Sequence, residues 1–191
     1  METLIVCLGN ERISDDGIGA VVGKVLRAVS LPANVTVCLA SQVTFDLLDK
    51  IATAEQVVLV EALACAGEPG SCTVVDVSDL PAGVASSECL HRAEVSQILD
   101  FVRYLACEGN PSGVAVAGIE ARHSGSYGAA FSEAVWSAVP RLVDLILLYV
   151  GARVEARTAV REAFIRLTAP DAETTDAWPF SRGLSHNMLA V

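Results

Sequence analysis

Short runs of apolar, largely β-branched residues recur over the first 120 residues and predict five β-strands. Glycine, proline or polar residues bound each run, as they commonly bound strands. The predicted strands cover residues 3–8, 35–39, 56–61, 71–76 and 114–119. Cys7 and Cys38 fall inside two of these runs, where a thiol is usually a small core residue.

Between the runs, apolar residues recur every three or four positions, which is the spacing of one face of an α-helix. The clearest case begins at Gly17 and ends before Pro32; its apolar positions are Ile18, Val21, Val22, Val25, Leu26 and Val29. Further helices are predicted over residues 45–51, from about 91 to 107, and from Ser132–Glu133 through Tyr149. Pro140 is an awkward interior residue of the last helix.

Strands that alternate with helices predict an α/β fold: a three-layer sandwich with a mostly parallel, twisted, five-stranded sheet between helices. The composition, 52% hydrophobic and 19% charged, suits strands that are covered on both faces. Residues 1–168 are expected to form a single domain, since 191 residues suffice for one well-buried core. Periodicity is lost from about Pro170, so residues 169–191 are predicted to be an irregular tail.

Charge and cysteine usage restrict the classes of partner and compartment. A net charge of −10 argues against a nucleic-acid binder and suits a basic or metal-loaded protein partner. The apolar stretch 142–150 is interrupted by Asp144 and is too short to span a membrane. The six cysteines form no CxxC pair, and no secretory signal precedes the first strand. These features indicate the reducing cytoplasm.

Ligands of open parallel sheets bind beyond the carboxyl ends of the strands. The first such place is Gly9-Asn10, followed by Asp15-Asp16 at the start of a helix. One acid can cap free N–H groups there while the other points elsewhere. Gly17 and Gly19 are costly in a helix and indicate close approach of backbone or partner.

Two further places follow the third and fourth strands. Glu61 ends an apolar strand, where it either is buried against a cation, metal or donor, or is solvated beyond the strand end. Glu88 and His91 share a face if a helix has begun there, although residues 86–91 also fit an N-terminal capping run. Three carboxylates at one rim repel one another without a cation, so the residues alone indicate no more than a divalent-metal site.

Taken together, these motifs resemble the [NiFe]-hydrogenase maturation proteases, which remove a C-terminal extension from the nickel-containing large subunit. The matching stretches are colinear: residues 8–10, 15–19, 57–62, 67–70, 86–88, 118–120, 131–135 and 138–140. The resemblance implies a phosphorylase/hydrolase-like sheet between helices, a hydrogenase large-subunit precursor as partner, and nickel that is carried by the substrate or shared with it.

Matched by position, the resemblance implies a nickel-recognition site of Asp16, Glu61 and Glu88, with His91 as a substitute ligand. Glu61 keeps a carboxylate where the family has Asp, and Glu88 stands where the family has His. The substrate-binding residues implied in the same way are Gly9, Asn10, Asp15 and Gln42. Gln42 lies in a stretch, residues 40–44, that replaces the family's Gly-Gly-Thr loop with a Gln-x-Thr variant.

The implied activity is that of an endopeptidase acting after nickel insertion. A second interpretation stays open because two ligand positions are altered: a non-catalytic homologue that binds the precursor as a nickel checkpoint or chaperone. Peptidyl-tRNA hydrolases share a similar opening, but their Thr-Arg-His-Asn element is missing here and the charge disfavours tRNA.

Overall fold

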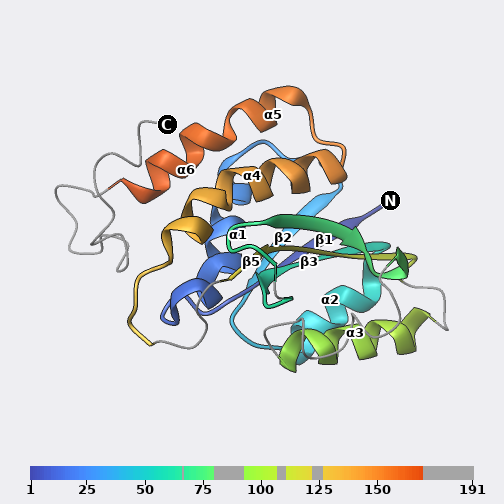
Figure 1. The fold of residues 1–191 in the computed structure, drawn as a ribbon. Coiled ribbons are helices and arrows are strands. Elements are labelled where there is room, and N and C mark those ends of the chain that lie inside the picture. The colour runs from blue at the N-terminus through green and yellow to red at the C-terminus, as the bar shows by residue number, and fades with distance from the viewer. Residues whose placement is uncertain (66, 80–92, 107–110, 122–126, 170–191) are drawn as a thin grey trace.

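A five-stranded sheet lies between two layers of helices (Figure 1) in the computed structural model, which describes residues 1–65, 67–79, 93–106, 111–121 and 127–169. The strands are β1 (Thr3–Leu8), β2 (Val35–Ala40), β3 (Gln56–Leu63), β4 (Cys72–Asp76) and β5 (Gly113–Glu120). The α-helices are α1 (Ile18–Ala28), α2 (Phe45–Thr53), α3 (Ala93–Ala106), α4 (Glu133–Tyr149), α5 (Val154–Thr158) and α6 (Val160–Thr168). Two short 3-10 helices, η1 (Ser14–Gly17) and η2 (Val77–Asp79), complete the described elements.

The order of strands in the sheet is β2-β1-β3-β5-β4. β1 pairs in parallel with β2 and β3, and β3 pairs in parallel with β5. β4 runs antiparallel to β5 at the edge of the sheet. The predicted α/β architecture with a mostly parallel sheet is therefore confirmed, and β4 is the strand that makes it mixed.

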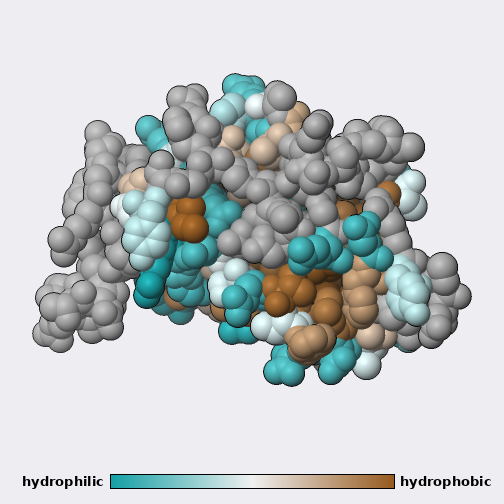
Figure 2. All heavy atoms as spheres, turned by 90° about the horizontal axis from the view of Figure 1, so that it is seen from below, coloured by the Kyte–Doolittle hydropathy of each residue, from teal (hydrophilic) through white to brown (hydrophobic). Residues whose placement is uncertain are grey.

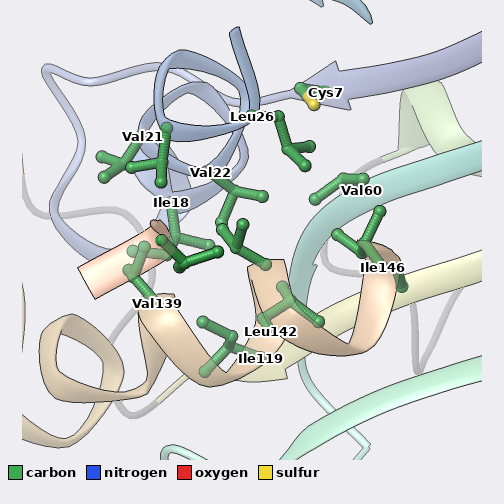
Figure 3. Packing of buried hydrophobic residues seen from close by; sticks show 14 of the residues in the cluster. Cys7, Ile18, Val21, Val22, Leu26, Val60, Ile119, Val139, Leu142 and Ile146 are labelled. Atoms are coloured by element: carbon green, nitrogen blue, oxygen red, sulfur yellow. The ribbon is translucent and has the colours of Figure 1, made fainter. Parts of the chain in front are cut away.

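The two faces of the sheet bury separate apolar clusters. On one face, α1, α4, α5 and α6 pack on residues of β1, β3 and β5, as Figure 3 shows for Cys7, Val60 and Ile119 opposite α1 and α4. On the other face, α2 and α3 cover the smaller cluster around Val6, Leu59 and other residues of the same parity. Figure 2 views this second layer from outside and shows apolar surface among polar residues.

Two short helices after α4 were not predicted from the sequence. α6 packs against α1 and α4, and the Trp136 and Phe164 rings lie 5.2 Å apart. The buried residues Ala156, Val160, Ala163 and Phe164 have the i, i+4, i+7, i+8 spacing of a helix face, so the signal was present.

α4 continues across Pro140, as predicted from its flanking periodicity. No helix within the described ranges has both the length and the apolar character needed to cross a membrane. Residues 170–191, which make up nearly all of the predicted tail, lie outside the described part of the chain.

Candidate functional site

The loop that leaves β1 is held in place by backbone hydrogen bonds. Gly9 N–H donates to Ala40 O at the end of β2, Ile13 N–H donates to Asn10 O, and Asp16 N–H donates to Ile13 O. Ser14 has a φ of 40°, in the left-handed region that is uncommon for a residue with a Cβ. Its hydroxyl donates to Ala130 O at 3.0 Å, so a distant segment supports this conformation.

Asp15 is fully buried, and its carboxylate receives two hydrogen bonds from the residue preceding α4. Ser132 donates its backbone N–H to Oδ1 at 2.6 Å and its hydroxyl to Oδ2 at 2.9 Å. A carboxylate at this place also complements the positive end of the α4 dipole. One acid of the pair thus caps a helix, as the sequence suggested, but the helix is α4 and not the one that begins beside it.

Asp16 is buried, with 5% of its surface exposed, and lies over the carboxyl end of β1. Its Oδ2 accepts a hydrogen bond from Asn10 N–H at 3.3 Å. A Cβ at Gly9 would lie 2.7 Å from the Asp16 carbonyl oxygen, so only glycine permits this close approach. The two acids therefore have separate environments although they are adjacent in sequence.

Glu61 lies within β3, because this strand continues to Leu63 and Glu61 is in register with Gly118 of β5. Its exposed fraction is 1%, so the interpretation of Glu61 as solvated beyond the strand end is wrong. By the alternation of β3, its side chain shares a face with Leu59 and Leu63, on the side of α2 and α3.

Asp16 and Glu61 both lie at the carboxyl edge of the sheet. A Cβ at Gly19 would lie 1.9 Å from Leu8 O and 2.8 Å from Val60 O, so the start of α1 is wedged between the ends of β1 and β3. η1 contacts β3 directly. This packing places the segment carrying Asp16 beside the strand carrying Glu61.

The third predicted metal position cannot be placed, since Glu88 and the substitute ligand His91 lie outside the described residues. Among the described residues, no three Asp, Glu, His or Cys side chains form a group that could hold a metal ion. The donor chemistry of Asp16 and Glu61 suits a divalent cation, because buried carboxylates are stabilised by an opposite charge.

A pocket of about 330 Å³ lies between the β1 loop and the end of β2. Its lining includes the predicted substrate-binding residues Gly9 and Asn10, together with Glu11, Arg12, Ala20 and residues 39–41. Gln42 follows directly and is exposed, whereas Asp15 is enclosed by Ser132. Of the predicted substrate residues, Asn10 is half-buried and Gln42 exposed, Gly9 is buried at the pocket lining, and Asp15 supports the loop from inside.

Glu120 was not singled out as a site residue, yet it is a further buried carboxylate at the same edge, 6% exposed. Its Oε1 accepts a hydrogen bond from Gly67 N–H at 3.0 Å, and its backbone bonds to Gly70 and Ser71. The signal was available, because Glu120, like Glu61, directly follows an apolar run in the sequence. It fastens the β3–β4 loop to β5.

Cys7 is a buried core residue, as expected from its place in β1. Burial raises the pKa of the Cys7 thiol far above its usual range, so this side chain stays protonated and unreactive. Cys38 is half-buried on β2.

The sequence model of the hydrogenase maturation proteases matches residues 20–148, more than half of the chain. This stretch begins directly after Gly19, so it does not include the β1 loop that first suggested the resemblance. A comparison with curated proteins found no match.

Solved structures of maturation proteases have the same fold. The maturating endopeptidase HybD from E. coli is 18% identical, with a TM-score of 0.67 over 79% of this chain and 93% of that one. HybD from Thermococcus kodakarensis is 22% identical, with a TM-score of 0.63 over 78% and 99%. The hydrogenase 2 maturation peptidase from a Thaumarchaeota archaeon is 26% identical, with a TM-score of 0.55 over 80% and 100%. The chain belongs to the hydrogenase maturation protease family.

Proposed function

We propose that this protein is a cytoplasmic endopeptidase that removes the C-terminal extension of a [NiFe]-hydrogenase large-subunit precursor after nickel insertion. The observation that supports this most directly is the burial of Asp16 and Glu61 at one edge of the sheet. The coarser activity, that of a maturation protease, follows from the family.

Burying two like-charged carboxylates at one edge of the sheet is costly, and a cation that binds both would lower that cost. Nickel carried by the precursor would be such a cation, so Asp16 and Glu61 would distinguish the nickel-loaded precursor from the empty one. In this proposal Glu88 supplies a third ligand, or His91 in its place. In this proposal Gly9, Asn10 and Gln42 would form the surface that receives the peptide, and Asp15 would hold the loop.

The test compares cleavage of nickel-loaded and nickel-free precursor by the wild-type protein and two isosteric amide variants. Asp16→Asn and Glu61→Gln keep the shape of each side chain and remove its charge. Each is expected to lower the rate of cleavage of the nickel-loaded precursor by about 100-fold, the upper range for losing support of a metal site. Glu162→Gln, at an exposed position of α6, is the matched control and is expected to cut normally.

The result also separates the two candidate functions. If the wild-type protein leaves the nickel-loaded precursor intact while another maturation protease cuts its own precursor in the same assay, the enzymatic proposal is overturned. Nickel-dependent binding without cleavage, together with gain of cleavage by Glu88→His, would instead identify a non-catalytic checkpoint. This second candidate rests on Glu88 standing where the family has histidine.

A further inference from the structure

The lining of the pocket beside the β1 loop combines apolar residues with one arginine. Ala20, Leu39 and Ala40 are its apolar residues, and Arg12 also lines it. Its volume, about 330 Å³, is at the lower end of the range of ligand pockets. Such a combination suits a side chain that has an aliphatic stem and an anionic end.

The backbone of Arg12 is fixed on both sides, which gives the exposed side chain a defined origin. Its N–H donates to Asn10 Oδ1 at 3.1 Å, and its carbonyl accepts from Gly128 N–H at 2.7 Å. Ile13, the next residue, forms an isolated antiparallel bridge with Tyr127. The Arg12 side chain therefore extends from a backbone segment whose position is fixed.

The charges around the pocket leave Arg12 as its available cation. Glu11 is also in the lining, but its carboxylate forms an ion pair with Lys24 at 2.6 Å. Within the described part of the chain, no carboxylate forms an ion pair with Arg12. In a chain with a net charge of −10, this is a local exception to an otherwise repulsive field for anions.

The pocket adjoins the edge where Asp16 and Glu61 lie. Asn10 lines the pocket and also donates its backbone N–H to Asp16 Oδ2. A peptide whose metal-bearing part reaches Asp16 would therefore place a nearby residue over this pocket.

We infer that the pocket is a specificity subsite that takes an acidic side chain of the precursor, with Arg12 pairing its carboxylate and Ala20, Leu39 and Ala40 covering its methylene groups. The inference rests on the proposed function, since it names one residue class of that same substrate. Arg12 is assigned here as a specificity residue and has no part in bond cleavage. A planar guanidinium suits this task because it can bind a carboxylate through two parallel hydrogen bonds.

The test measures binding and cleavage of the nickel-loaded precursor by Arg12→Glu, Arg12→Gln and Arg12→Lys. Arg161→Glu, the same charge change at an exposed position of α6, is the control. Arg12→Glu is expected to raise Kd and KM by about tenfold with kcat little changed, and Arg12→Lys to lie between it and the wild type. Thermal unfolding of each variant shows whether the fold is intact.

Substrate variants identify the partner of Arg12. Each acidic residue near the cleavage site is changed singly to its amide. At one position the change is expected to weaken binding to the wild type by about tenfold and to leave binding to Arg12→Gln unchanged, the signature of a coupled pair. A Lys at that position should restore binding to Arg12→Glu.

The outcomes separate this inference from the function on which it rests. A wild-type protein that neither binds nor cuts the nickel-loaded precursor contradicts the proposed function. A wild-type protein that engages the precursor, while Arg12→Glu behaves like Arg161→Glu or no acidic position is coupled to Arg12, overturns the subsite alone.

Discussion

The two ends of the sheet differ in the polar side chains that they contain and in how deeply these are buried. At the amino end, Thr3 donates to Gln56, Gln56 donates to the Tyr149 hydroxyl, and that hydroxyl donates to Asp76. At the carboxyl end, four carboxylates are at most 6% exposed: Asp15, Asp16, Glu61 and Glu120. This amino-end network contains one acid, Asp76, which accepts from the neutral Tyr149 hydroxyl, whereas the carboxyl end concentrates buried carboxylates.

This difference distinguishes polar groups that serve the fold from polar groups that serve the site. The amino-end network joins the strands through hydrogen bonds between buried Thr3 and the half-buried Gln56, Tyr149 and Asp76. Two acids at the carboxyl end, Asp15 and Glu120, fasten loops to the body of the protein. Asp16 and Glu61 are the buried acids that the proposed function assigns to the nickel-loaded precursor.

The largest expected effect is a difference in stability loss when a glycine at each end of the sheet is replaced by alanine. Gly19→Ala places a methyl group 1.9 Å from Leu8 O, so backbone must move at the carboxyl end. We expect a loss of about 3 kcal/mol or more in the free energy of unfolding, the upper range for overpacking. Gly113→Ala, at the amino end, meets only Gln56 Cγ at 3.9 Å and should change stability little. Urea unfolding measures both, and equal losses would refute the contrast.

Asp15→Asn tests whether a buried acid at the carboxyl end acts structurally. The amide cannot accept both Ser132 hydrogen bonds and carries no charge for the α4 dipole, so a loss of about 2 kcal/mol is expected. Ser132→Ala should cost less, and the double variant should lose less than the sum, because both changes break one contact. Asp46→Asn, in the exposed first turn of α2, is the control. Strict additivity would contradict this assignment.

Tyr149→Phe tests the amino end and should have a smaller effect. It removes the hydroxyl that lies 2.5 Å from Asp76 Oδ1 and 3.1 Å from Gln56 Nε2. Because all three groups are half-buried, a loss of about 1 kcal/mol is expected. Precursor cleavage should be unaffected, in contrast to Asp16→Asn. Tyr127→Phe, at a 73% exposed ring, provides the baseline.

The smallest effect is a pH dependence at the amino end. Burial, together with the Asp76 carboxylate, raises the pKa of Tyr149 from 10.0 to about 12. At a pH below 10.0, the pKa of the unfolded chain, Tyr149 keeps its hydroxyl proton in both states. Its contribution to the free energy of unfolding is therefore fully present at such a pH. As pH rises through this window, the unfolded chain loses the proton first and stability falls. Unfolding of wild type and Tyr149→Phe should therefore converge between 10.0 and about 12; a constant difference would contradict the shift.

Much of the fold could be predicted because its elements have local signals. Each predicted strand lies within about two residues of the observed one, and α4 spans Glu133–Tyr149 as expected. The end of β3 was set two residues early, since Glu61 looks like a boundary when the strand is considered alone. Ala62 and Leu63 continue the strand because β5 pairs with them, a contact between distant segments.

The site was harder to predict because its partners are far apart in sequence. Sequence reasoning located Asp15 and Asp16 but could not say which one caps a helix, since Ser132 lies 117 residues away. Glu120 was passed over because its partner, Gly67, is an unremarkable loop glycine. The strand order alone decides that β1 and β3 are neighbours, and this is what brings Asp16 near Glu61.

The links between the β1 loop and residues 128–132 have a consequence for biosynthesis. Arg12, Ser14 and Asp15 each bond to this later segment. During translation the loop is made early, yet its supports leave the ribosome only after most of the domain has been synthesised. A nascent or truncated chain that ends before residue 128 would lack these supports, so the ordered edge arises only once the whole domain has assembled.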